Sequence, residues 1–274
     1  MRLPRLAMIA ASAAMTGISA AQAATMLAPH RAVYDLELDQ ASDRSGITGI
    51  RGRMVYEFEG SPCDGYTVNF RFVTRIDTPD VSRLSDIQTS SYEDGEGKTF
   101  DFVTKSFVDQ TPEKEVKGTA HLDEGGTDVA LVKPDQRQLE LGKAFFPTQH
   151  LLDLIARAEK SENFYEARIF DGSEDADKVM TTTVVIGRKS PVRQNDPERN
   201  AMKTLADDQF WPVEMAYFDL SEGNGEEIPS YRISFKLHEN GVTRDLVMDY
   251  GDFSMKGTLV DLALLDRKGP ACDR

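Results

Sequence analysis

The stretch Tyr231–Tyr250, YRISFKLHENGVTRDLVMDY, decides the fold of this chain. Apolar and polar side chains alternate along its first part, which is typical of an extended strand with one buried face. That face would carry Tyr231, Ile233, Phe235 and Leu237. The pair Asn240-Gly241 precedes a second extended segment, Thr243–Tyr250, and favours a type I′ turn, which needs positive φ at both central residues. The stretch therefore predicts an antiparallel hairpin with one buried and one solvated face.

The same period of two extends outward over most of the chain, and Gly, Pro, Asp or Asn bound each segment. Further strands are expected at Arg31–Leu38, Gly52–Glu59, Tyr66–Ile76, Leu84–Tyr92, Thr99–Val108, Glu113–Leu122, Val129–Leu141, Phe164–Phe170, Val179–Ile186, Pro212–Leu220 and Gly257–Leu265. Gly125-Gly126 marks another turn between two of them. So many antiparallel strands must hide their edges by closing or curling. The pattern predicts an all-β protein built on a barrel-like or spiral sheet.

One segment departs from this alternation. Apolar residues recur at helical spacing in Pro147–Lys160, where Thr148 could cap the start, so a single helix should pack on the sheet. The polar stretch Lys189–Arg199 contains two prolines and is interpreted as a loop. No composition break divides the chain, which predicts one domain over residues 24–274.

The N-terminus indicates export. Arg2 and Arg5 form a basic region, Leu6–Ala20 is largely apolar, and Ala21-Gln22-Ala23 matches a signal peptidase site. Residues 1–23 are therefore predicted to be a signal peptide, with an uncleaved anchor as the alternative. No later segment has the about 20 apolar residues that a membrane span needs, and no Cys follows the cleavage site to carry a lipid. We expect a soluble periplasmic protein.

The net negative charge of the chain limits the classes of molecule that it could bind. The net charge is −14, and loss of Arg2 and Arg5 with the signal peptide would leave 30 basic residues against 46 acidic ones. Such a surface repels phosphate backbones and anionic headgroups. Nucleic-acid binding and charge-driven adsorption to membranes are therefore not expected.

The chain contains two cysteines, Cys63 and Cys272. In an oxidising compartment an even pair favours one disulfide. A disulfide between Cys63 and Cys272 would close a very long loop and so restrict the unfolded chain. This loss of chain entropy would stabilise the fold by about 5 kcal/mol at most. Two unrelated buried thiols are the alternative. A metal site is disfavoured because no second Cys or His lies near either one at ligand spacing.

Catalytic signals are weak. Of the four histidines, His150 falls in the first turn of the expected helix, where it could be a general base but is better interpreted as a packing or capping residue. There is no Gly-x-Ser-x-Gly elbow, no phosphate-binding loop and no dinucleotide fingerprint. Trp211, the single tryptophan, could line a ligand surface, although a place in the core is favoured.

The acidic run Asp171–Asp177 invites a calcium interpretation. It departs from the EF-hand loop because its sixth position is Ala176 instead of Gly and its twelfth is Thr182 instead of Glu. An acidic turn between two strands is the simpler interpretation. We expect no metal and no cofactor.

Several short motifs occur in a characteristic order from about His30 to Cys272. They are His30-Arg31-Ala32, Cys63-Asp64-Gly65, Pro147-Thr148-Gln149-His150, Phe170-Asp171-Gly172, Trp211-Pro212-Val213, Glu239-Asn240-Gly241-Val242 and Asp249-Tyr250-Gly251-Asp252-Phe253. Together they resemble the EipB family of periplasmic cell-envelope integrity proteins. The resemblance implies a β-spiral with few helices, a disulfide that joins Cys63 to Cys272, and a role in envelope maintenance under stress. It brings no catalytic residues.

The functional hypothesis is a non-enzymatic, monomeric periplasmic protein that supports envelope integrity. It would bind an extended peptide, a lipid or an envelope protein on the concave face of its curled sheet. A periplasmic lipid or lipoprotein carrier is the alternative, and a hydrolase of envelope polymers is less favoured. The sequence does not identify the ligand-binding residues.

Overall fold

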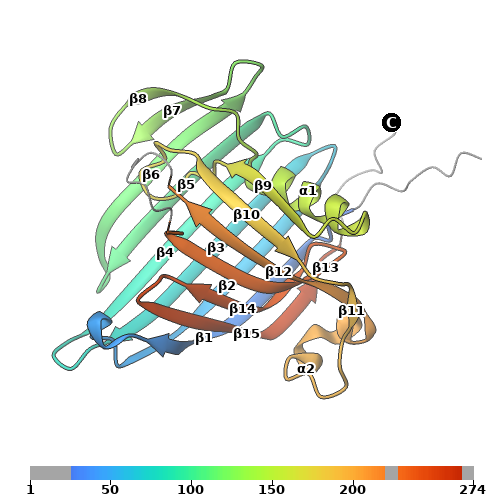
Figure 1. Ribbon diagram of the computed structural model, residues 1–274. Helices are drawn as coiled ribbons and strands as arrows, with labels where there is room; N and C mark the ends of the chain where they lie inside the picture. The colour runs from blue at the N-terminus through green and yellow to red at the C-terminus, as the bar shows by residue number, and fades with distance from the viewer. Residues whose placement is uncertain (1–25, 220–227, 267–274) are drawn as a thin grey trace, which may run out of the picture.

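One curled antiparallel sheet organises residues 26–219 and 228–266, which the computed structural model describes (Figure 1). Its first eight strands are β1 His30–Ala41, β2 Gly49–Ser61, β3 Gly65–Asp77, β4 Ser82–Glu93, β5 Thr99–Val108, β6 Thr111–Leu122, β7 Thr127–Lys133 and β8 Arg137–Leu141. The remaining strands are β9 Phe164–Ile169, β10 Met180–Ile186, β11 Ser190–Pro191, β12 Gln209–Phe218, β13 Tyr231–His238, β14 Thr243–Asp249 and β15 Phe253–Leu264. The helices are α1 Pro147–Glu159 and α2 Arg199–Met202, with 3₁₀ turns at Asp43–Ser45 and Lys203–Asp207.

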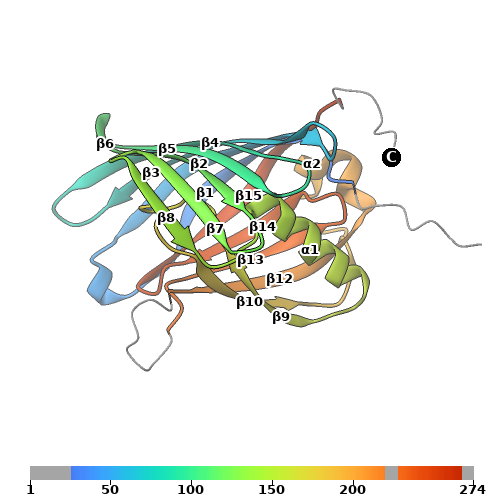
Figure 2. The ribbon, with the colours of Figure 1, turned by 90° about the horizontal axis from the view of Figure 1, so that it is seen from above.

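The first and last strands lie side by side in the middle of the sheet. The strand order is β8-β7-β6-β5-β4-β3-β2-β1-β15-β14-β13-β12-β10-β9, and β1 pairs with β15 from His30↔Leu264 to Ala41↔Phe253. The sheet therefore rolls in both directions from β1, so that β3–β5 lie opposite β9, β10 and β12 (Figure 2). The two edge strands, β8 and β9, do not pair with each other. The predicted curled, incompletely closed all-β sheet is confirmed.

The hairpin of β13 and β14 is confirmed, but its turn differs from the prediction. The His238 N–H donates to the carbonyl of Val242, and the Gly241 N–H donates to that of His238. Within this loop only Gly241 has positive φ, at 87°. The two-residue type I′ turn is therefore wrong. The connection is longer, and Gly241 supplies the left-handed residue that longer hairpin loops use.

Two further expectations were wrong in detail. The single strand expected at Val129–Leu141 is two strands, β7 and β8, because Pro134 lacks the N–H that a continued ladder would need. The expected loop Lys189–Arg199 contains β11, and α2 begins at Arg199. Leu220, the expected end of β12, lies outside the described residues.

Helix α1 occupies its predicted range, but Thr148 does not cap it. The N-cap position is Phe146, and no side chain of the helix caps it. Instead the carboxylate of Glu93, at the end of β4, accepts the N–H groups of Thr148 at 2.7 Å and Gln149 at 2.8 Å. A distant strand therefore supplies the hydrogen-bond acceptors that the first N–H groups of a helix lack. Leu154, Ile155 and Ala158 of α1 are buried in one apolar cluster with Trp211 and other residues of the roll.

A buried ionic network holds the segment around α2 against the sheet. The guanidinium of Arg244, on β14, is fully buried and donates from Nη1 to Asp196 at 3.0 Å and Glu198 at 3.1 Å. Its Nε lies 3.0 Å from Nε2 of His238. Glu198 also accepts the backbone N–H of Leu259, on β15, at 2.6 Å. The network therefore joins three strands to one loop.

Candidate functional site

The roll encloses an apolar cavity of about 380 Å³, called here the chamber. This volume lies in the range of small-molecule sites. One wall carries Tyr34, Met54, Tyr56, Phe70, Phe72 and Ile87, from β1–β4. The facing wall carries Tyr231, Ile233 and Phe235 from β13 with Leu246 and Met248 from β14. Strand alternation predicted that the β13 side chains share a face, and the roll turns that face inward.

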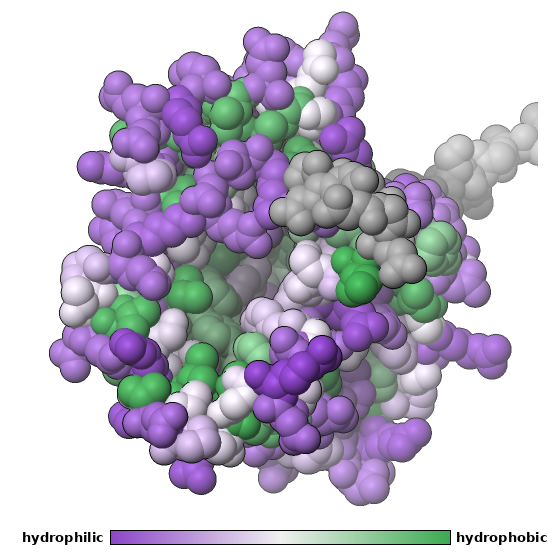
Figure 3. Space-filling model, turned by 60° about the vertical axis from the view of Figure 1, so that its left-hand side comes forward, coloured by the Kyte–Doolittle hydropathy of each residue, from purple (hydrophilic) through white to green (hydrophobic). Residues whose placement is uncertain are grey.

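The chamber has a closed and an open end. At the closed end, Leu151 of α1 lies beside Gly241, where an added Cβ would meet Leu27 at 2.7 Å. At the open end Tyr250 is 40% exposed, and its ring lies 5.0 Å from that of Tyr231. Figure 3 shows a hollow in the surface with hydrophobic side chains inside and hydrophilic ones around it. A ligand could therefore enter beside the tyrosines.

The chamber wall offers few polar groups. Among the described residues that line it, none is Asp, Glu, Lys, Arg or His. The hydroxyl of Tyr34 donates to the carbonyl of Thr243 at 2.6 Å and is thus already used. Each wall strand pairs with a neighbour on both sides, so its backbone groups are engaged in the sheet. Apart from the tyrosines Tyr56, Tyr231 and Tyr250, which also carry hydroxyl groups, the wall offers a ligand mainly apolar surface.

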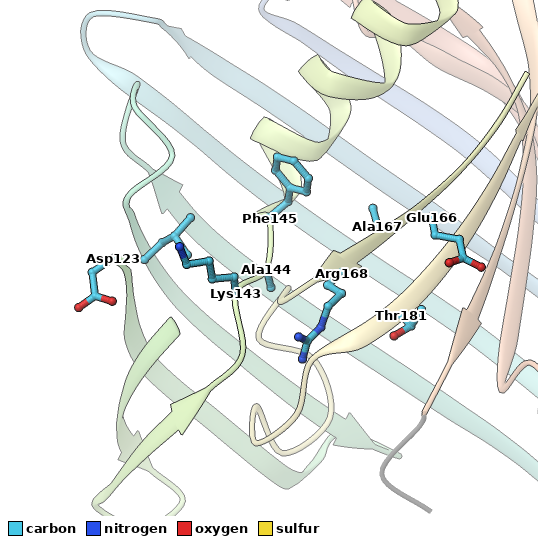
Figure 4. Close-up of a pocket in the computed structure, with 9 residues that line it drawn as sticks. Asp123, Lys143, Ala144, Phe145, Glu166, Ala167, Arg168 and Thr181 are labelled. Atoms are coloured by element: carbon cyan, nitrogen blue, oxygen red, sulfur yellow. The ribbon is translucent and has the colours of Figure 1, made fainter. Parts of the chain in front are cut away.

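A second hollow, called here the seam groove, lies where the sheet ends at β9 (Figure 4). Its volume is about 550 Å³, and it is more open than the chamber. Glu166 and Arg168 of β9 line it together with Lys143 and Phe145 of the segment before α1 (Figure 4). One parallel bridge, Phe145↔Ile169, joins this segment to β9. The seam groove thus combines charged side chains with an edge strand that is only partly paired.

His150 is a packing residue. It is buried on α1, and its Nε2 lies 3.1 Å from the hydroxyl of Tyr165 on β9. Burial lowers the pKa of His150 to about 4, so the ring is neutral at ordinary pH. It reaches neither the chamber nor the seam groove. The interpretation as a packing histidine is confirmed.

Trp211 and the acidic run are also structural. Trp211 is 3% exposed within the apolar cluster at α1, with Nζ of Lys189 at 4.3 Å from its ring centroid. Asp171–Asp177 form the turn between β9 and β10, where Asp175 pairs with Lys114 at 2.7 Å. Over residues 26–219 and 228–266, no three His, Cys, Asp or Glu side chains gather to hold a metal ion.

Cys63 lies in the turn between β2 and β3, and Cys272 lies outside the described residues. The disulfide between them stays a prediction. Residues 1–23, the predicted signal peptide, also lie outside the described part. Within that part no helix is both long enough and apolar enough to cross a bilayer.

Glu93 was not found by sequence reasoning. It is 2% exposed, and burial raises its pKa to about 7, against the opposing effect of the two helix N–H groups. In sequence it is one of 46 acidic residues, placed just after an expected strand. No local pattern marks it, because its partners lie 55 and 56 positions away.

The fold and the chamber define a class: an all-β protein whose rolled, unclosed sheet surrounds an uncharged cavity. Residues 21–266 match the model of the EipB-like family. The chain is 50% identical over 273 residues to the cell envelope integrity protein EipB of Brucella abortus, covering 97% of this chain and 96% of that protein. The chain belongs to the EipB-like family.

A solved structure supports the same fold. It is the crystal structure of a β-barrel-like protein of a domain of unknown function, also from Brucella abortus. The TM-score is 0.85 at 52% sequence identity, over 89% of this chain and all of that one. The relative's name concerns envelope integrity and not catalysis. A role at the cell envelope is therefore supported by the family.

Proposed function

We propose that this protein is a non-enzymatic periplasmic protein that supports envelope integrity by holding the apolar part of a partner in the chamber. The uncharged cavity, open at one end, carries this proposal. The name of the Brucella relative supports the envelope role. Catalysis is not part of the proposal, because His150 is committed to packing and His238 to the ionic network.

The test is complementation of a deletion strain under envelope stress, for example by detergent. Ile233→Trp would fill the chamber from β13, whereas Ser234→Trp places the same side chain on the opposite face of the strand. We expect Ser234→Trp to restore growth and Ile233→Trp to fail at equal protein level. Full complementation by both variants would contradict the proposal.

A lipid or lipoprotein carrier is the second candidate, favoured by the exposed Tyr250 at the open end. A carrier must release its cargo, so it should speed transfer of a labelled lipid between two vesicle populations. Binding without transfer would favour the first candidate. Transfer that persists in Ile233→Trp would contradict a carrier role for the chamber.

Export and the disulfide are proposed together. β15 ends beside β1, whose other neighbour β2 leads to Cys63, so the two chain segments lie at the same end of the sheet. Six positions separate Asp266, the last described residue, from Cys272. The intact mass of periplasmic protein should correspond to a chain that begins at Ala24 and lacks two hydrogens. Two free thiols in the unfolded, unreduced protein would contradict the disulfide.

A further inference from the structure

We infer that the chamber takes a single acyl chain of a lipid and not a segment of peptide. This inference rests on the proposed function and specifies its ligand. Three features of the chamber support it: the backbone groups of its wall are already hydrogen-bonded within the sheet, the wall is uncharged, and the cavity is small.

The hydrogen bonds already formed by the backbone of the wall strands exclude a peptide strand from the chamber. A peptide buried in the chamber would lose water at each N–H and C=O, and every such group needs a new partner. The wall strands β1–β4, β13 and β14 are each paired on both sides, so they have no free row of backbone groups to offer. An acyl chain has no such groups and loses nothing when it is desolvated.

The uncharged wall also selects a hydrocarbon. Facing side chains such as Phe70, Phe72, Ile233 and Phe235 provide apolar contact on both sides of the cavity. No Asp, Glu, Lys, Arg or His among the described lining residues offers a charge that would fix a polar side chain or an amide in one orientation. Burial of methylene groups against such a wall is favourable without any directional contact.

The size limits the ligand to one chain. At ~30 Å³ for each water-sized group, a cavity of about 380 Å³ has room for roughly a dozen methylene groups. The closed end at Leu151 and Gly241 suits a methyl terminus. The open end, where the rings of Tyr231 and Tyr250 lie 5.0 Å apart, leaves the polar headgroup in water. Tyrosine suits such a boundary because its ring is apolar and its hydroxyl is polar.

The seam groove shows where a peptide would be expected instead. Strand β9 pairs with β10 on one side, and on the other side only Phe145 bridges it. Its partly open edge offers the backbone groups that strand addition uses. Peptide binding that maps to this groove would therefore not report on the chamber.

The experiment measures binding of cis-parinaric acid, whose fluorescence rises in an apolar site, to the full mature protein. Palmitic acid and a capped octapeptide of alternating valine and threonine serve as competitors. Ile233→Trp and Ile87→Trp fill the chamber from opposite walls, and Ser234→Trp is the matched control. We expect palmitic acid to compete and the peptide not to compete. Each chamber variant should lower the affinity for cis-parinaric acid by about tenfold or more, and the control variant should bind it as the wild type does.

Two results would overturn the inference, and they differ in whether they also contradict the proposed function of the chamber. If the peptide displaces the probe and palmitic acid does not, the acyl chain is wrong while a binding role for the chamber stands. If both tryptophan variants fold and bind the probe as well as the wild type, the chain does not enter the chamber. Complementation by Ile233→Trp in the same strain would then remove the proposed function as well.

Discussion

The chamber and the seam groove are two hollows of one sheet, and they differ in what the sheet leaves available. In the chamber every wall strand has two neighbours, so the backbone is used and apolar side chains decide recognition. At the seam groove β9 has one full neighbour and a single bridge to Phe145. There the charged side chains Lys143, Glu166 and Arg168 lie beside a partly open edge.

The difference follows from the incomplete closure of the roll. A closed barrel has no edge, whereas this sheet ends at β8 and β9. Natural edge strands carry charges that discourage pairing with other chains, as β9 does with Glu166 and Arg168. One curled sheet can therefore offer an apolar interior and a polar edge at the same time.

Loss of the predicted disulfide should destabilise the whole sheet, including both hollows, and should have the largest effect on the free energy of unfolding. We expect Cys63→Ser to lower the free energy of unfolding by about 2–5 kcal/mol in oxidising conditions. Urea denaturation measures the change. The Cys63→Ser/Cys272→Ser double variant should be no less stable than either single one, because each removes the same bond. Additive losses would show that the two thiols are not linked.

Shortening a side chain in the chamber wall should lower the free energy of unfolding more than shortening one at the seam groove. Leu246 is 5% exposed, so Leu246→Ala should cost about 3 kcal/mol through lost burial and an enlarged cavity. Lys143→Ala, at the exposed seam, should cost less than about 0.5 kcal/mol. Thermal unfolding of both variants provides the comparison. Equal losses would mean that the wall is not packed as the structure has it.

The closed end of the chamber should respond to pH through Glu93. Its pKa in the folded protein, about 7, exceeds the ordinary value of 4.5, so the folded state binds the proton more tightly. Stability is then greatest below the ordinary pKa and falls as pH rises through 7, by about 3 kcal/mol at most. Glu93→Gln should remove this part of the pH dependence of the unfolding free energy.

Glu96→Gln is the matched control for Glu93, because Glu96 is exposed in the next loop and pairs with Lys98. Its pH profile should follow that of the wild type. A Glu93→Gln profile that also follows the wild type would refute the assigned role of Glu93.

Charge reversal at the seam should have the smallest effect. The double variant Lys143→Glu/Arg168→Glu alters the seam groove without touching the chamber. Binding of cis-parinaric acid should stay unchanged, and stability should shift by less than about 0.5 kcal/mol. Weaker probe binding in this variant would indicate that the two hollows are coupled.

Sequence alternation determined most of the strands, the hairpin of β13 and β14, the range of α1 and the curled form of the sheet. These features depend on contacts between near neighbours, or on a general requirement that edges be hidden, and a local pattern contains both. The same alternation placed Tyr231, Ile233 and Phe235 on one face. It could not show that this face meets Phe70 and Phe72 across a chamber.

Only the tertiary structure decided which distant groups meet. Glu93 caps α1 across 55 positions, and Arg244 reaches Glu198 across 46. The chamber and the seam groove likewise depend on how far the sheet rolls and where it stops. Each of these contacts is set by the packing of the whole sheet, because no local pattern of residues specifies a partner so far away in the chain.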